Sequence, residues 1–276
     1  MVQTAQKTLY ATDLTLHMLA GKSYKPLPNT TLNEKYTHLT EMEIPTNSYP
    51  KLKYLVVGNG GDSFAKEDGK YSISQHTPID GALFNQIPFV IRRVNNDISD
   101  AQKANYRMRV ISIINNVTYA AYYMKVLPDM DIPANVNKIT TNTNSSSDTI
   151  QYSSITVFDT NEEDILNPRP RYKNINFNSL TNTTRVSRLA KVLLQLTEYD
   201  LSELHNSLTT LGYTNSNIRE IGLCSGWEVT ANGLKDVIGA QILFHIGMNI
   251  DTNIELHENK VLNKVIELGG EEPLVY

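Results

Sequence analysis

The chain has 276 residues, of which 40% are hydrophobic and 20% are charged, and its formal net charge is −4. These values exclude wholesale disorder and fit either one large β-rich domain or two smaller ones. The negative net charge also argues against nucleic acid as a partner, because the chain has no global basic field to attract polyanions.

Signals for the cellular compartment are few. The single cysteine, Cys224, excludes an intrachain disulfide framework and fits assembly in a reducing cytoplasm. The first residues lack the charged and apolar regions of a signal peptide, and no apolar run approaches the roughly 20 residues of a membrane span. We therefore expect no membrane partner.

Residues 1–50 predict an N-terminal helix followed by an extended arm. The helix is indicated by leucines among good helix formers, with Gly21 as the stop. Recurring prolines between Tyr24 and Pro50 forbid long regular elements there. Such an arm packs either on a neighbouring subunit or on its own domain, and the sequence leaves both open. If it serves assembly, deletion of residues 2–50 should leave the β core soluble but abolish higher-order assembly.

Residues 51–276 predict a β-rich domain. Alternating or β-branched apolar runs indicate strands at 54–57, 89–94, 106–114, 118–127, 218–223, 239–247 and 261–268. Together with the helices, these strands predict an α+β, β-rich fold that contains an antiparallel sheet or sandwich.

Two segments interrupt this domain. Residues 135–149 are almost devoid of apolar side chains, so we expect a polar loop there. Residues 185–211 contain two leucine-rich stripes at helical spacing that are out of phase, which predicts a helical pair with a break near 197–200. Asp200 and Glu203 are expected to form the N-cap box of the second helix, and Gly212 its stop.

No motif in the sequence predicts a catalytic, cofactor or metal site. The turn Gly58–Gly61 follows a strand but lacks the lysine and hydroxyl of a P-loop. The six histidines show no paired ligand spacing, and His245 in an apolar strand is expected to be a hydrogen-bonded core residue. Cys224 has no neighbouring base, so a buried, inert thiol is expected.

Two charged clusters have more than one interpretation. The acidic run at Glu162, Glu163 and Asp164 could bind a hard cation, although a solvated loop is the more ordinary role. The basic cluster consists of arginines that pair either across a subunit boundary or within the sheet. Its members are Arg92, Arg93, Arg107 and Arg109.

Several short segments together resemble the N-terminal, tail-anchoring domain of tail-collar fibre proteins from contractile phages. They are Tyr54–Gly61, Thr77–Phe84, Arg92 with Arg93, Tyr106–Ile114 and Glu220–Leu223. In that family an apolar strand ends in a Gly-rich turn, a Thr-Pro/Leu segment follows, and strands lead to an Ile-Gly-Leu signature. This chain departs from the pattern by a polar insertion and helical pair before Glu220 and by the lack of a repetitive shaft.

The resemblance implies a compact virion component of the tail, baseplate, collar or neck. Such a protein would be a non-enzymatic homo-oligomer, assembled in the host cytoplasm into a ring that anchors other virion structural proteins. Two alternatives stay open. One is a capsid or decoration protein; the other is a carbohydrate-acting β-sandwich enzyme with a carboxylate pair such as Asp97 and Asp100, or Glu162 and Asp164. The single tryptophan offers little for sugar stacking.

Overall fold

The computed structural model describes residues 5–64, 71–73, 75–130, 132, 136–143, 151–159, 165–166, 182–214, 217–252 and 262–273. Over these residues the fold is β-rich, with antiparallel sheets and a few helices, as the sequence predicts. The chain divides into two compact units. The first contains Met1–Asp129 and Leu193–Ile266, and the second contains Met130–Val192 and Glu267–Tyr276.

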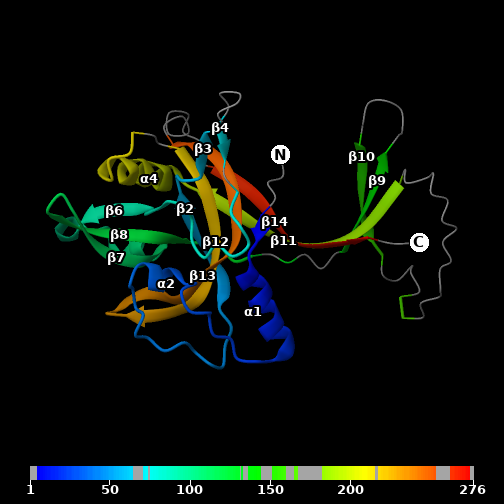
Figure 1. The fold of residues 1–276 in the computed structure, drawn as a ribbon, viewed down its shortest axis with the longest axis horizontal. Helices are drawn as coiled ribbons and strands as arrows, with labels where there is room; N and C mark the ends of the chain where they lie inside the picture. The colour runs from blue at the N-terminus through cyan, green and yellow to red at the C-terminus, as the bar shows by residue number, and fades with distance from the viewer. Residues whose placement is uncertain are drawn as a thin grey trace. The chain divides into compact units, whose positions relative to one another are not determined.

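The first unit contains an eight-stranded sheet with the order β1–β13–β12–β2–β8–β6, in which β5 also pairs with β2 and β7 with β8 (Figure 1). Its strands are β1 (Gln6–Lys7), β2 (Lys51–Gly58), β5 (Gln86–Ile87), β6 (Val90–Arg93), β7 (Tyr106–Ile114), β8 (Val117–Val126), β12 (Asn217–Ala231) and β13 (Leu234–Asp251). Beside it, β3 (Asp62–Phe64) and β4 (Tyr71–Ile73) form a separate two-stranded sheet. The predicted strands of this unit are confirmed, although β12 and β13 are longer than expected.

Two tight hairpins set the register of this sheet. Asn115 and Asn116 join β7 to β8, and their φ angles of 49° and 62° are those of a type I′ turn. Asn232 and Gly233, with φ angles of 51° and 76°, join β12 to β13 in the same way. Asparagine and glycine tolerate the left-handed region better than other residues, so they allow the strands to reverse with little strain.

The predicted N-terminal helix is confirmed as α1 (Leu9–Ala20), which ends at Gly21 with a φ of 60°. The following arm contains the short helix α2 (Leu32–Lys35) and packs on its own sheet. Before α1, Thr8 donates its N–H to the Leu243 carbonyl at 2.9 Å, and within the arm the Asn33 side chain bonds to the β13 backbone. Of the two placements left open for the arm, the described contacts show packing on its own domain.

The expected helical pair at 185–211 is wrong in its first half. Residues Asn182–Leu196 form strand β11, and only α4 (Glu198–Thr210) is helical. Around 192–196 the buried side chains alternate with exposed ones, which is the period of a strand. The capping box is formed by Thr197 and Asp200 instead of Asp200 and Glu203, so α4 begins three residues earlier than expected.

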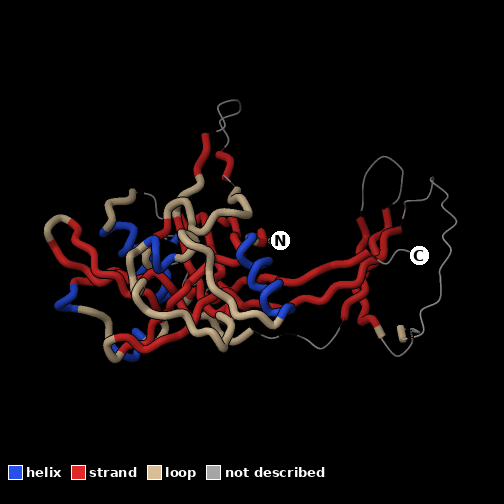
Figure 2. Tube along the Cα trace, turned by 60° about the horizontal axis from the view of Figure 1, so that its bottom comes forward, coloured by secondary structure: helices blue, strands red, loops and turns tan. Residues whose placement is uncertain are grey.

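Two further short helices belong to the first unit: η1 (Val94–Asn96) and α3 (Asp100–Lys103). Most of a four-stranded sheet with the order β10–β9–β11–β14 belongs to the second unit. Its other strands are β9 (Val136–Thr143), β10 (Gln151–Phe158) and β14 (Leu262–Pro273). The polar loop expected at 135–149 is therefore wrong over 136–143, where threonines and Ile139 pair with β10 and β11. Residues 135 and 144–149 lie outside the described residues. Figure 2 shows the strands and helices from a second direction.

Candidate functional site

The carboxylate of Glu220 lies where three segments that are far apart in the sequence meet. It accepts hydrogen bonds from the backbone N–H groups of Gly60 and Phe84, both at 2.7 Å, and of Asn85 at 3.2 Å. The Nε2 atom of His76 lies 2.8 Å from its second oxygen. We call these five residues the Glu220 junction. Glu220 is buried, so the junction is an internal contact.

His76 is fixed on all sides within the junction. Its ring stacks between those of Phe84 and His245, with centroid distances of 4.0 and 3.9 Å. Its Nδ1 atom lies 3.1 Å from the carboxylate of Asp80. His245 in turn makes a 3.0 Å hydrogen bond with the Asp80 carbonyl, so its interpretation as a hydrogen-bonded core residue is confirmed.

The charge of Glu220 is stabilised inside the protein. Burial raises the pKa of Glu220, but the hydrogen bonds from His76 and the backbone N–H groups lower it more, so the net pKa lies below its usual value. Gly58 and Gly60 give this carboxylate its space, because a Cβ atom at either position would lie 2.7 Å from Glu220 Oε1. The glycine-rich turn therefore accommodates a carboxylate from its own chain.

Asp97 and Asp100, proposed as a catalytic carboxylate pair, are each engaged by a basic side chain of the chain itself. Asp97 accepts hydrogen bonds from Arg109 Nε and the Tyr122 hydroxyl, both at 3.0 Å. Asp100 begins α3, is 90% exposed, and contacts Lys103 at 3.0 Å. Glu162 and Asp164, proposed as the other catalytic pair and as part of a cation-binding run, lie outside the described residues.

The arginine cluster pairs within the chain at most of its positions. Arg92 contacts Glu203 of α4, Arg107 contacts Glu228 at 2.7 Å, and Arg109 contacts Asp97. The remaining member, Arg93, is exposed at the end of β6. Cys224 is buried, as expected, and burial raises the pKa of its thiol. The part of the chain that the structure describes holds no group of three or more His, Cys, Asp or Glu residues suited to a metal ion.

A second buried carboxylate contact, at Asp200, was not predicted from the sequence. Lys125 Nζ lies 2.6 Å from one oxygen of Asp200, and the Tyr106 hydroxyl donates to the other at 2.6 Å. Burial raises the pKa of Asp200, but Lys125 and the hydrogen bonds lower it by more. The net pKa of Asp200 therefore lies below its usual value. A lysine within the apolar, aromatic strand 117–126 was the available signal for a buried partner.

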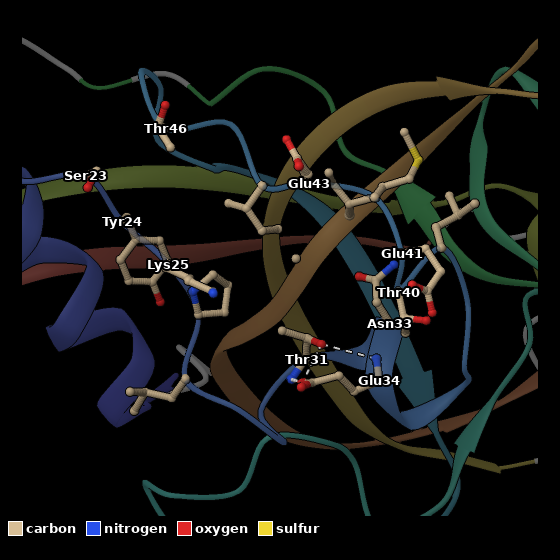
Figure 3. A pocket seen from close by; sticks show the side chains of 17 residues that line it. Ser23, Tyr24, Lys25, Thr31, Asn33, Glu34, Thr40, Glu41, Glu43 and Thr46 are labelled. Carbon is tan, nitrogen blue, oxygen red and sulfur yellow. Dashed lines mark hydrogen bonds between the residues drawn. The ribbon is translucent and has the colours of Figure 1, made fainter.

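The arm also forms an open groove of about 620 Å³ in the first unit (Figure 3). Glu34, Glu41 and Glu43 line it, and Lys25 is its one basic lining residue among those described. The apolar lining comes from Tyr24, Pro26, Leu27, Leu39, Met42, Ile44 and Ile238. Apolar walls with an excess of acidic side chains suit a protein segment that carries apolar and basic residues.

The fold defines a β-rich α+β protein. Most of the candidate ionisable side chains that the structure describes are engaged in contacts within the chain. The whole chain, residues 1–276, matches the model of a family of unknown function, DUF7208, and the protein belongs to that family. Neither the curated proteins nor the solved structures gave a match. Among the described helices, none is long and apolar enough to cross a membrane.

Proposed function

We propose that the protein is a non-enzymatic structural component of a tailed-phage particle. In this proposal it self-assembles into a ring or adaptor in the tail, baseplate, collar or neck, and there it anchors other virion proteins. The virion is its final location, and the host cytoplasm is where it assembles.

The observation that carries self-assembly is the regular placement of apolar side chains on the outside of described elements. On α1, Leu9, Leu16 and Leu19 follow helical spacing on one outer face, and Leu19 is 80% exposed. On β7, Ile111 and Ile113 are exposed on one face of the strand. Exposed apolar side chains gathered along one face of an element are typical of surfaces that contact other proteins.

The arrangement of the resemblance segments supports the assignment to a phage particle. The Gly-rich turn at 58–61, the segment Thr77–Phe84 and the Glu220–Leu223 signature contact one another in the Glu220 junction. Segments that resemble one domain family therefore make one structural unit in this chain. A capsid or decoration protein would share these properties and differ in its position in the particle. The enzyme alternative loses support because Asp97 is engaged by Arg109 and Tyr122.

Self-assembly is tested with the purified full-length chain. Sedimentation velocity over a concentration series and negative-stain imaging should show discrete oligomers or closed rings. A strictly monomeric chain at every concentration, with hydrolytic activity towards a polysaccharide, would overturn the proposal.

The location is tested separately, on purified particles. Mass spectrometry of particles should detect the chain at a fixed copy number, and antibody labelling should mark one axial position. Labelling over the whole head would support the capsid alternative, and absence from particles would reject a virion role.

A further inference from the structure

Strand β7 is an outer strand of the first unit's sheet, lying on the opposite side of β8 from β6 (Figure 1). Among the described strands, β7 pairs with β8 alone. Its outer half carries Ile111 and Ile113, whose exposed fractions of 49% and 74% are large for isoleucine. This half of β7 is therefore an apolar sheet edge that faces solvent.

The backbone groups available at this edge follow from the hairpin geometry. In a two-residue hairpin the flanking residues, here Ile114 and Val117, hydrogen-bond to each other, and the pattern then alternates along the strand. The Tyr122 carbonyl, opposite Arg109, accepts the Phe89 N–H at 2.8 Å on the other side of β8, which fits the same alternation. The N–H and C=O groups of Ile111 and Ile113 therefore point away from β8.

Neighbouring stretches of sheet edge are covered from within the chain. On β13 the Ala240 N–H donates to the Asn33 side chain at 2.9 Å, and the Leu243 carbonyl accepts from Thr8. At the start of β7 the Met108 N–H donates to Asp236 at 2.7 Å. In the described part of the chain, the outer half of β7 is left without such a cover.

The usual protection against edge-to-edge pairing is also missing here. Natural edge strands carry lysines, prolines or inward-pointing charges that block a second strand. In this chain no charged residue and no proline occurs between Arg109 and Lys125. The edge is therefore suited to receive another strand.

We propose that two copies of the chain pair through β7, antiparallel and about a two-fold axis at Ser112. This inference rests on the proposed self-assembly and names one of its contacts. The axis at Ser112 places Ile111 of each copy directly opposite Ile113 of the other. The two-fold symmetry gives two such pairs, so all four exposed isoleucines become covered. It also aligns the outward N–H and C=O groups of both strands for hydrogen bonding.

A second copy is the occupant that the charges favour. Two copies of a charged segment repel each other when they pair. Residues 110–124 contain no charged side chain, so this repulsion does not arise here. Moving the axis by one residue, to Ile111, would place Ile113 opposite Arg109, which already contacts Asp97. The axis at Ser112 is thus the one that matches apolar with apolar side chains. The contact is small, so we expect a concentration-dependent dimer that larger assemblies reinforce.

Cysteine cross-linking tests the axis in the full-length chain. In the proposed pairing Ser112 faces itself as a non-hydrogen-bonded pair, with Cα atoms about 4.5 Å apart, which a disulfide spans. Ser112→Cys should therefore give a covalent dimer under oxidised glutathione. Thr118→Cys, exposed on β8 one strand further in, is the matched control and should not cross-link. The native Cys224 is buried and does not compete.

A backbone block tests the hydrogen bonds. Ile113→Pro removes an N–H that β8 does not use, so the fold should persist by circular dichroism while self-association weakens by about tenfold or more. Ile113→Val keeps both the N–H and a branched side chain, and it should associate as the wild type does. Amide hydrogen exchange should show protection of Ile111 and Ile113 that grows with protein concentration.

The outcomes separate this contact from self-assembly in general. If the wild type assembles, Ile113→Pro assembles equally well and Ser112→Cys fails to cross-link, the β7 contact is overturned and the proposed function stands. Protection of Ile111 and Ile113 only after another virion protein is added would also overturn the second copy as occupant. A chain that stays monomeric under all conditions would overturn both proposals.

Discussion

Single buried carboxylates connect segments of this chain that are far apart in the sequence. Glu220, Asp200 and Asp236 are each buried, and each accepts hydrogen bonds from more than one segment. A buried charge is tolerated only when such partners replace the water it loses. These carboxylates therefore make the packing of the first unit specific as well as stable.

Loss of the charge at Glu220 should destabilise the fold. Glu220→Gln puts an amide N–H₂ group where the carboxylate now accepts from Gly60 or Phe84, so buried donors lose their acceptor. We expect the free energy of unfolding, measured in urea, to fall by about 2–4 kcal/mol. The control Glu41→Gln, at an exposed position, should change it by less than about 0.5 kcal/mol. Equal urea midpoints for the two variants would contradict the role of the junction.

The same contacts predict a loss of stability in acid. The folded-state pKa values of Glu220 and Asp200 lie below their ordinary values of 4.5 and 3.8. Their stabilisation is complete above those ordinary values, and it is lost as the pH falls through the folded-state pKa values. Wild-type stability should therefore drop between about pH 5 and pH 3, and Glu220→Gln should show a shallower drop. Parallel urea curves at several pH values measure both slopes, and identical slopes would reject the assignment.

Secondary-structure elements show where sequence patterns were sufficient. Strand 106–114 was predicted with its observed bounds, because its side chains alternate between two faces along the sequence. Residues 185–196 were predicted as helix because Val186, Leu189, Leu193 and Leu196 match helical spacing. The buried positions in the structure are instead Val192, Leu194 and Leu196, at strand spacing. Pairing within the sheet decided between two patterns that the sequence supports equally.

The Glu220 junction could not be assembled from the sequence. Its donors come from 135 to 160 residues earlier in the chain, and no local pattern links them. The sequence did single out the Gly-rich turn and the Glu220 segment, but it gave no sign that one holds the carboxylate of the other. The Asn232–Gly233 hairpin, in contrast, had a readable signal, since Asn-Gly between apolar runs favours a type I′ turn.

Comparison of the two hairpin turns gives a prediction at the scale of the element. Asn116 has a φ of 62°, a conformation in which glycine meets no Cβ penalty, and Gly233 occupies the equivalent position in the other hairpin. Asn116→Gly should therefore raise the free energy of unfolding by about 0.5 kcal/mol, whereas Asn116→Val should lower it by about 1–2 kcal/mol. Thermal and urea unfolding measure both. A stabilising valine would contradict the assigned turn.

At the scale of the whole molecule, the arm is part of the first unit's core and also shapes the acidic groove. Tyr24 and Leu32 are almost completely buried, and Asn33 covers the edge of β13. The groove and the β7 edge are thus distinct surfaces of one unit. Distinct surfaces on one subunit are what a closed ring or a layered assembly requires.

Deletion of residues 2–50 should accordingly destroy the fold instead of leaving a soluble β core. Burial of Tyr10, Leu14, Tyr24 and Leu32 contributes about 1.5–3 kcal/mol each, and their sum is comparable with the roughly 5–15 kcal/mol that keeps a domain folded. We expect the truncated chain to be insoluble, or soluble without a cooperative unfolding transition in urea. Leu19→Ser, at an exposed position of α1, should unfold like the wild type. A truncated chain with a cooperative transition would show that the arm is dispensable for folding and would return it to a role in assembly alone.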